Sequence, residues 1–117
     1  MTITLATLSD ATKQEVFTQV SNHLLAQMKQ SKLKSTSGIC AYRGLDGLKC
    51  AAGCLMSNSE AVKIPENASW RKLVKEELVP KDHCELIDNL QFIHDEEQPG
   101  TWEESLKRFA SYNGLTF

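Results

Sequence analysis

The chain has 117 residues, of which 41% are hydrophobic and 24% are charged, and its formal net charge is −2. This composition is that of an average globular protein, which excludes disordered and fibrous classes, and the length suits one modest core. The N-terminus has no basic flank, and no apolar run approaches the roughly 18 residues of a membrane span. We therefore expect one domain over residues 1–117, located in the cytoplasm, where thiols stay reduced.

Charge is distributed unevenly along the chain. Residues 1–59 contain six Lys and Arg against three Asp and Glu, whereas residues 60–117 contain seven against twelve. Neither half is basic enough to predict nucleic-acid binding, so we do not expect a nucleic-acid partner.

The first predicted helix begins after Ser9 and Asp10, either of which can cap free backbone N–H groups, and runs to about Gln30. Its apolar residues recur at helical spacing and predict one buried stripe. The basic segment 29–38 follows and reads as a solvated connector.

The segment "GICAYRGLDGLKCAAGCLM", residues 38–56, contains three of the four cysteines and four of the six glycines. Two short runs, residues 39–43 and 48–52, flank Asp46-Gly47, a dipeptide that favours a hairpin turn. We therefore predict a β-hairpin here. The alternative is that residues 49–56 form a short helix, since several of them tolerate that state.

Three short helices are predicted in the rest of the chain. Residues 70–78 have one apolar face and precede Pro80, which stops a helix. Capping-box patterns at residues 82–85 and 101–104 each open a further helix, and Gly114 ends the last one. The predicted fold class is therefore α+β: a long N-terminal helix, a β-hairpin and three short helices in one small domain.

The cysteines raise the question of a metal site. Their spacing is C-x9-C-x3-C followed by a distant fourth thiol, and only one pair has the spacing of a zinc knuckle. The fourth ligand would have to come from Cys84, His83 or His94. The candidate zinc ligands are Cys40, Cys50, Cys54 and Cys84. No other cofactor is expected.

The hairpin register decides whether two of these thiols can meet. With a two-residue turn, Cys40 and Cys50 point to opposite faces, whereas a three-residue loop with Gly47 in the left-handed conformation places them diagonally on one face. Buried packing is the simpler role for reduced cysteine. A reactive thiol is the third alternative, for which Cys84 is best placed because it lies near a helix N-terminus.

No catalytic constellation is apparent, so we do not predict an enzyme. The acidic residues around Trp102 can instead meet a basic partner, and the lysines of segment 29–38 an acidic one. The candidate residues for partner binding are Lys29, Lys32, Lys34, Tyr42, Arg43, Asp95, Glu96 and Glu97.

The segments "EVFTQVSNHLLAQ", "CAYRGLDGLKCAAGCL", "LQFIHD" and "W…SLKRFASYNGL" resemble a group of small uncharacterised proteins of tailed bacteriophages and prophages. The resemblance spans most of the chain, although residues 56–70 differ from the acidic, tyrosine-containing loop of that group. It implies a phage or bacterial cytosolic setting and no particular activity. The function predicted is that of a small phage-type protein that binds and modulates a host or defence-system protein, with zinc binding through the cysteines and then thiol-dependent catalysis as alternatives.

Overall fold

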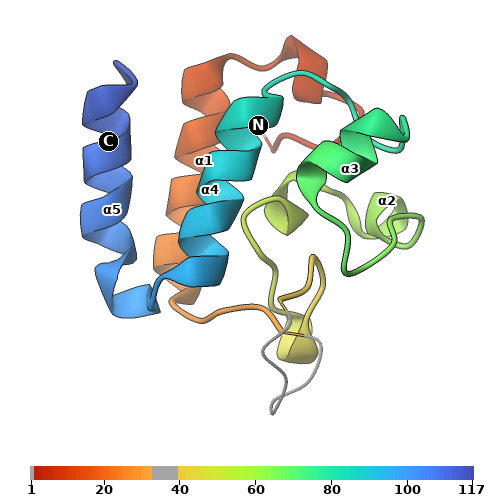
Figure 1. Cartoon of the computed structure of the whole chain (residues 1–117), viewed down its shortest axis with the longest axis horizontal. Coiled ribbons are helices and arrows are strands. Elements are labelled where there is room, and N and C mark those ends of the chain that lie inside the picture. Colours follow the sequence, from red (N-terminus) through yellow and green to blue (C-terminus); the bar gives the residue numbers. More distant parts are fainter. Residues whose placement is uncertain (1, 33–39) are drawn as a thin grey trace.

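The computed structural model describes residues 2–32 and 40–117, and this part of the chain consists of helices, turns and loops. Three helices of similar length pack against one another, and a shorter helix packs on one of them (Figure 1). The α-helices are α1 (Lys13–Gln27), α2 (Asn58–Ala61), α3 (Trp70–Lys75), α4 (Cys84–Glu96) and α5 (Pro99–Tyr112), and the 3-10 turns are η1 (Leu8–Asp10), η2 (Leu45–Gly47) and η3 (Gly53–Leu55). None of the helices described has the length and apolarity that a membrane crossing requires.

Helix α1 starts later and ends earlier than the sequence predicts. Its N-cap is Thr12, whose hydroxyl accepts from the Glu15 N–H at 3.1 Å while the Glu15 carboxylate accepts from the Thr12 N–H at 2.8 Å. This reciprocal capping box satisfies two backbone donors at once. Met28 adopts the left-handed conformation, with φ of 51°, and therefore ends the helix before Gln30.

The core lies where α1, α4 and α5 meet. Phe17 of α1 stacks on Phe109 of α5 with ring centroids 6.0 Å apart, and Trp102 of α5 is fully buried. Burial of such large apolar side chains is the main favourable contribution to folding. Other large side chains with less than 2% exposure include Leu8, Leu24, Leu55, Trp70, Leu73, Ile87, Leu90 and Leu106.

The predicted α+β class is wrong. The described residues contain no strand, only two isolated antiparallel bridges, Lys32 with Cys40 and Arg43 with Lys49. Four helices rather than three follow the predicted hairpin, and α4 and α5 are nearly as long as α1. The fold is helical, with an irregular segment in place of the hairpin.

Backbone N–H groups on both sides of the turn are bonded by side chains. The Glu66 carboxylate accepts from the N–H groups of Tyr42 and Arg43, at 2.8 and 3.2 Å. The Lys49 N–H donates to the Gln27 side chain of α1 at 3.0 Å. In the observed register, Arg43 and Lys49 form a non-hydrogen-bonded pair, and Tyr42 would be the next residue to pair across the hairpin. Because Glu66 accepts from the Tyr42 N–H, the described residues do not extend the ladder beyond the turn.

The turn itself has the three-residue form. Arg43 lies opposite Lys49, which is the register in which three residues form the loop. Gly47 has the left-handed φ of 75° that this loop requires, and Asp46 also has a positive φ, 55°. Ile39, where the predicted hairpin begins, lies outside the described residues.

Two glycines of this segment allow close approach of other backbone. A Cβ on Gly53 would lie 2.1 Å from the Tyr42 carbonyl oxygen, and one on Gly44 would lie 2.7 Å from the Lys32 backbone nitrogen. Neither contact is tolerable, so both positions require glycine. The alternative helix over residues 49–56 is reduced to η3.

The predicted capping boxes of the later helices are absent. The N-cap of α4 is His83, with φ of 62°, and that of α5 is Gln98; neither makes a side-chain cap bond. The patterns at residues 82–85 and 101–104 are therefore misleading. The predicted end of the last helix is confirmed, because Gly114 is left-handed with φ of 66°.

Candidate functional site

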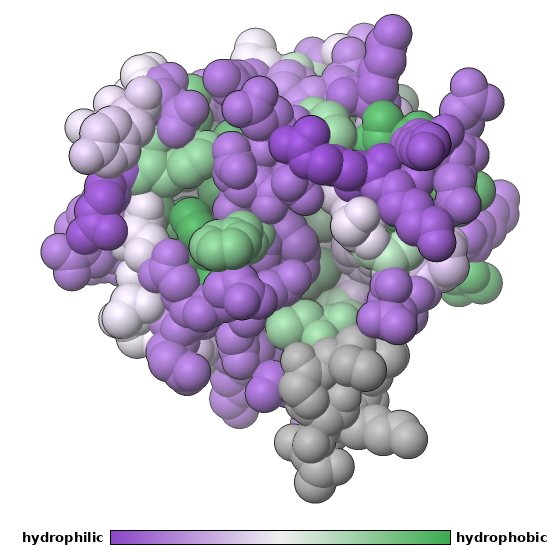
Figure 2. Space-filling view, in the orientation of Figure 1, coloured by the Kyte–Doolittle hydropathy of each residue, from purple (hydrophilic) through white to green (hydrophobic). Residues whose placement is uncertain are grey.

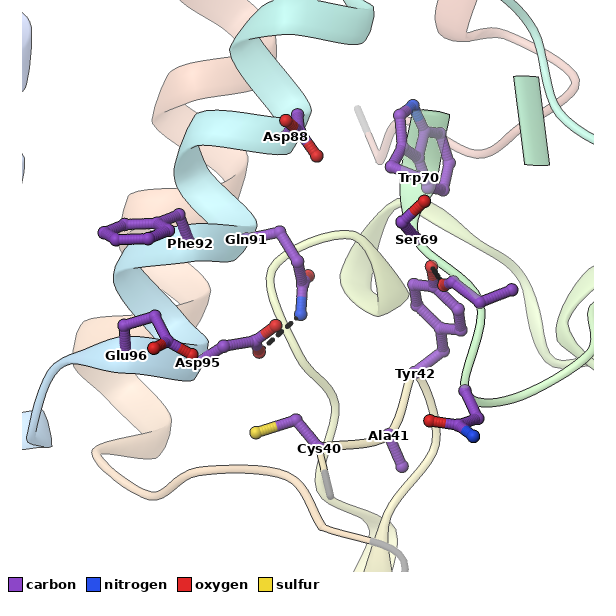
Figure 3. Close-up of a pocket in the computed structure, with 12 residues that line it drawn as sticks. Cys40, Ala41, Tyr42, Ser69, Trp70, Asp88, Gln91, Phe92, Asp95 and Glu96 are labelled. Atoms are coloured by element: carbon purple, nitrogen blue, oxygen red, sulfur yellow. Dashed lines mark hydrogen bonds between the residues drawn. The ribbon is translucent and has the colours of Figure 1, made fainter. Parts of the chain in front are cut away.

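A cavity of about 430 Å³ lies between α4 and the segments 40–42 and 67–70 (Figure 3). Such a concave site with convergent polar groups is where ligands commonly bind. Its lining residues are Cys40, Ala41, Tyr42, Asn67, Ala68, Ser69, Trp70, Asp88, Gln91, Phe92, Asp95 and Glu96.

Gln91 and Asp95 form the α4 wall of the cavity. They are four residues apart and therefore lie on the same face of the helix. The Gln91 amide donates to Asp95 Oδ1 at 2.7 Å, and its carbonyl oxygen accepts from the Ala52 N–H at 2.9 Å. Figure 3 shows both side chains pointing from α4 toward the segment that carries Cys40 and Tyr42.

His94 supports Asp95 from inside the fold. Its ring is fully buried and stacks on Trp102, with centroids 5.5 Å apart. His94 Nε2 faces the Ser31 N–H at 2.9 Å and must accept from it, so the neutral ring carries its proton on Nδ1. That proton is donated to Asp95 Oδ1 at 2.7 Å.

Cys40 faces the same carboxylate. Burial, the negative charge of Asp95 and a hydrogen bond to Asp95 together raise the pKa of the Cys40 thiol to about 12. At neutral pH the group is therefore a protonated donor rather than a nucleophilic thiolate.

Cys40, His94 and Asp95 are close enough to be considered as metal ligands. One donor atom from each lies within 4.8 Å of the other two. Zinc binding at His94 Nδ1 would move the ring proton to Nε2, where it would oppose the Ser31 N–H. The observed hydrogen bonds therefore suit a network of neutral donors around Asp95 better than a metal.

The other predicted zinc ligands lie apart from this cluster. Cys50 is fully buried and its sulfur accepts from the Gly53 N–H, while the Cys54 thiol donates to the Ala51 carbonyl at 3.1 Å. Burial raises the pKa of Cys50 strongly and that of Cys54 to about 12. Both thiols serve as small packing residues.

No hydrogen bond joins the Cys84 thiol to a histidine in the part of the chain that the structure describes. It is the first residue of α4, whereas His94 lies near the other end of that helix. His83 donates from Nε2 to the Ala11 carbonyl at 2.8 Å. A Cys–His nucleophilic pair is therefore not assembled around Cys84.

The wall opposite α4 is held by internal hydrogen bonds. Tyr42, a predicted partner-contact residue, is 5% exposed, donates from its hydroxyl to the Ala68 carbonyl and meets Trp70 edge-on with centroids 6.4 Å apart. Burial strongly raises the pKa of the Tyr42 phenol, which stays a neutral donor. With Glu66 bonded to the same segment, the two chain segments that form this wall are held to each other.

Two further predicted contact residues also bond within the molecule. Arg43 donates from its guanidinium to the carbonyls of Gly53 and Met56, the latter at 2.8 Å. Glu97 accepts from the Thr101 hydroxyl at 3.2 Å at the start of α5. Because these side chains already make hydrogen bonds within the molecule, fewer of their polar groups are available to contact a partner.

The two predicted lysines that the structure describes, Lys29 and Lys32, do not line the cavity. Lys29 is exposed just after α1, and Lys32 is half-buried, with its carbonyl accepting from the Leu45 N–H at 3.0 Å. Lys34 lies outside the described residues. Of the predicted contact residues, Asp95 and Glu96 are the acidic ones that line the cavity.

The outer ridge of α4, defined as Asp88, Phe92 and Glu96, borders the cavity. These residues are four apart and therefore share one face of the helix. Phe92 is 62% exposed, and Asp88 pairs with Arg71 of α3 at 2.9 Å. Figure 2 shows that hydrophilic residues cover most of this side of the molecule and that apolar residues interrupt them over α4.

Sequence reasoning missed Phe92, Asp88, Gln91 and Ser31. Phe92 had a detectable signal, because the buried stripe of α4 runs through Leu90 and Ile93 and leaves the aromatic residue outside it. Ser31 had none, since it meets His94 across 63 residues of chain.

Comparison with known proteins gives no identity: no protein family, no curated protein and no solved structure matches the chain.

Proposed function

We propose that this chain is a small binding module, set in a phage or bacterial cell, that binds a host or defence-system protein and modulates its activity. The outer ridge of α4 is the contact surface. The observation that carries the proposal is the exposure of Phe92 between two carboxylates on a surface-facing helix.

An exposed aromatic side chain supplies contact area at low entropic cost, and aromatic residues dominate the energetics of many protein interfaces. Asp88 and Glu96 flank Phe92 on the same ridge. Asp88 pairs with Arg71, so the charge of Glu96, together with that of nearby Asp95, attracts a basic partner and disfavours an acidic one. The partner therefore carries an apolar pocket surrounded by Lys or Arg.

A modulating role requires no chemistry of the chain itself. Three thiols have raised pKa values, and His94 has both ring nitrogens in hydrogen bonds. These groups maintain the shape of the domain beside the ridge. Inhibition or assembly by occupying a partner surface is the activity that such a domain supports.

Affinity purification from a bacterial lysate tests this function. The wild-type chain is expected to retain a stoichiometric partner, while Phe92→Ala and Glu96→Lys each lose it. Tyr112→Ala is the matched control, because Tyr112 is also an exposed aromatic residue, 83% exposed, but lies at the end of α5. Retention of the same partner by Phe92→Ala, or equal loss in Tyr112→Ala, would contradict the assignment.

Zinc binding is the competing function, favoured by the proximity of Cys40, His94 and Asp95. Elemental analysis of protein purified without added metal decides between them. One equivalent of zinc in the wild type that is lost in Cys40→Ser, but kept in Cys84→Ser, would support the metal site. If protein that contains no zinc still retains its partner, zinc is not required for partner binding.

A further inference from the structure

Asp95 carries a negative charge that no described cation neutralises. The two side-chain bonds at its Oδ1 come from His94 Nδ1 and Gln91 Nε2, at 2.7 Å each, and both donors are neutral. Among the residues described, neither Asp95 nor Glu96 forms an ion pair with Lys or Arg, whereas Asp88 pairs with Arg71. The Cys40 thiol is a third neutral donor to this carboxylate. The carboxylate is therefore oriented before any ligand arrives, and its negative charge is available to a cation that approaches through the cavity.

The position of this carboxylate is fixed from several parts of the chain. The buried ring of His94 is held by Ser31 and by stacking on Trp102, and Gln91 is held by the Ala52 N–H. A charge that is held in place need not reorganise when it binds a cation. This rigidity distinguishes Asp95 from an ordinary solvated surface acid.

The cavity beyond Asp95 is larger than a single ammonium group requires, at about 430 Å³. Its opposite wall includes Asn67 and Ser69, whose side chains contain oxygen acceptors, and the ring of Tyr42. Figure 3 labels Ser69 and Tyr42 on this wall. A planar cation with N–H donors on several of its edges can donate hydrogen bonds to acceptors on both walls at once. Guanidinium has this geometry, because it presents five N–H donors in a planar fork and packs well on aromatic rings, whereas ammonium is a point charge.

We infer that the cavity beside α4 binds the guanidinium group of an arginine side chain. That this arginine belongs to the partner protein rests on the proposed function; the preference of the cavity for guanidinium does not. The arginine enters beside the outer ridge, so that Phe92 packs on the partner while Asp95 and Glu96 pair with its cation.

Nuclear magnetic resonance titration with blocked amino acids tests the inference directly. The probes are Nα-acetyl-arginine methylamide, the corresponding lysine derivative and the corresponding citrulline derivative, a neutral isostere of arginine. At low salt, the arginine probe should shift the Gln91 side-chain NH₂ signals saturably. The lysine probe should bind about tenfold more weakly, and citrulline should cause no saturable shift.

Amino-acid substitutions test which carboxylates bind the guanidinium cation. Asp95→Asn should weaken arginine binding about tenfold, since one charge-assisted interaction is lost, and Glu96→Gln should weaken it about threefold. Glu104→Gln removes the same charge from the exposed face of α5, away from the cavity, and should leave binding unchanged. Thermal unfolding confirms that each variant is folded, and Glu96→Gln provides the test if Asp95→Asn is not.

Three results would overturn the inference: no saturable shift with arginine, equal affinity for lysine and arginine, or equal weakening by Glu96→Gln and Glu104→Gln. None of them affects the lysate experiment with Phe92→Ala. Conversely, if the chain binds arginine but retains no partner that depends on Phe92, the guanidinium site is supported and the proposed function is contradicted.

Discussion

The helices α1, α4 and α5 and the irregular segment 40–69 are stabilised in different ways. The helices contribute their own backbone hydrogen bonds and bury large apolar side chains such as Phe17 and Trp102. The irregular segment has little regular structure, and several of its backbone N–H groups are bonded by side chains distant in sequence, such as Glu66 within the segment and Gln91 of α4.

This difference separates two kinds of sequence requirement. In the helices, apolar residues of similar volume can replace one another at modest cost. In the irregular segment, a single carboxylate or amide satisfies specific backbone groups, and no residue of different chemistry substitutes for it. The cavity lies at the boundary, with one wall from each region.

Replacement of Trp102 should have the largest effect on stability. The ring is fully buried, stacks on His94 and donates from Nε1 to the Glu97 carbonyl at 3.1 Å. Trp102→Ala should lower the free energy of unfolding by about 3–5 kcal/mol. Chemical denaturation measures this change, with Tyr112→Ala as the exposed aromatic control. A loss below about 1 kcal/mol would mean that the helical region does not depend on its core.

Removal of the Glu66 carboxylate should have a smaller effect, confined to the irregular region. Glu66→Ala leaves the N–H groups of Tyr42 and Arg43 without their side-chain acceptor, which should cost about 1–3 kcal/mol. Glu76→Ala removes an exposed acid from the end of α3 and serves as the control.

Amide hydrogen exchange distinguishes the two regions in the Glu66→Ala variant. Protection should fall for Tyr42 and Arg43 while the interior of α1 keeps its protection. Uniform loss of protection over both regions would contradict the distinction between them.

Glu60 should produce the smallest of these effects and a dependence on pH. Burial acts to raise the pKa of its carboxyl, but hydrogen bonds from the N–H groups of Ser57, Leu5 and Ala6 outweigh burial and hold the pKa below its ordinary value of 4.5. A lowered pKa means that the unfolded chain binds the proton more readily. The stabilisation is therefore complete above pH 4.5 and is lost as pH falls below it.

Glu60→Gln should accordingly be less stable than the wild type by about 1 kcal/mol at neutral pH, and this difference should shrink below pH 4.5. Denaturation curves at several pH values measure it. A difference that stays constant down to pH 3 would show that the carboxylate charge is not responsible.

The sequence predicts the helical region better than the irregular one, because helical periodicity is a local signal. The apolar spacing locates α4 and α5, and Gly114 locates the end of the last helix. The three-residue turn is one of two registers that the Asp46-Gly47 pattern allows.

The hairpin prediction fails for a non-local reason. Glu66 accepts from the Tyr42 N–H, which the hairpin would otherwise pair, and nothing near the turn indicates that this distant side chain will compete for it. Of the acids that line the cavity, Asp95 and Glu96 are predicted as part of an acidic cluster, whereas Asp88 is not. The neutral donors that orient Asp95 meet it only through tertiary packing, which local patterns do not encode.

The bridge between Lys32 and Cys40 also has a use in protein engineering. Because the two residues face each other across an antiparallel pair, the ends of the chain on either side of residues 33–39 lie one strand spacing apart. A two-residue Asn-Gly turn spans such a gap. A shortened chain joined in this way, or a fluorescent or affinity insert placed there, provides a handle next to the cavity without altering any helix.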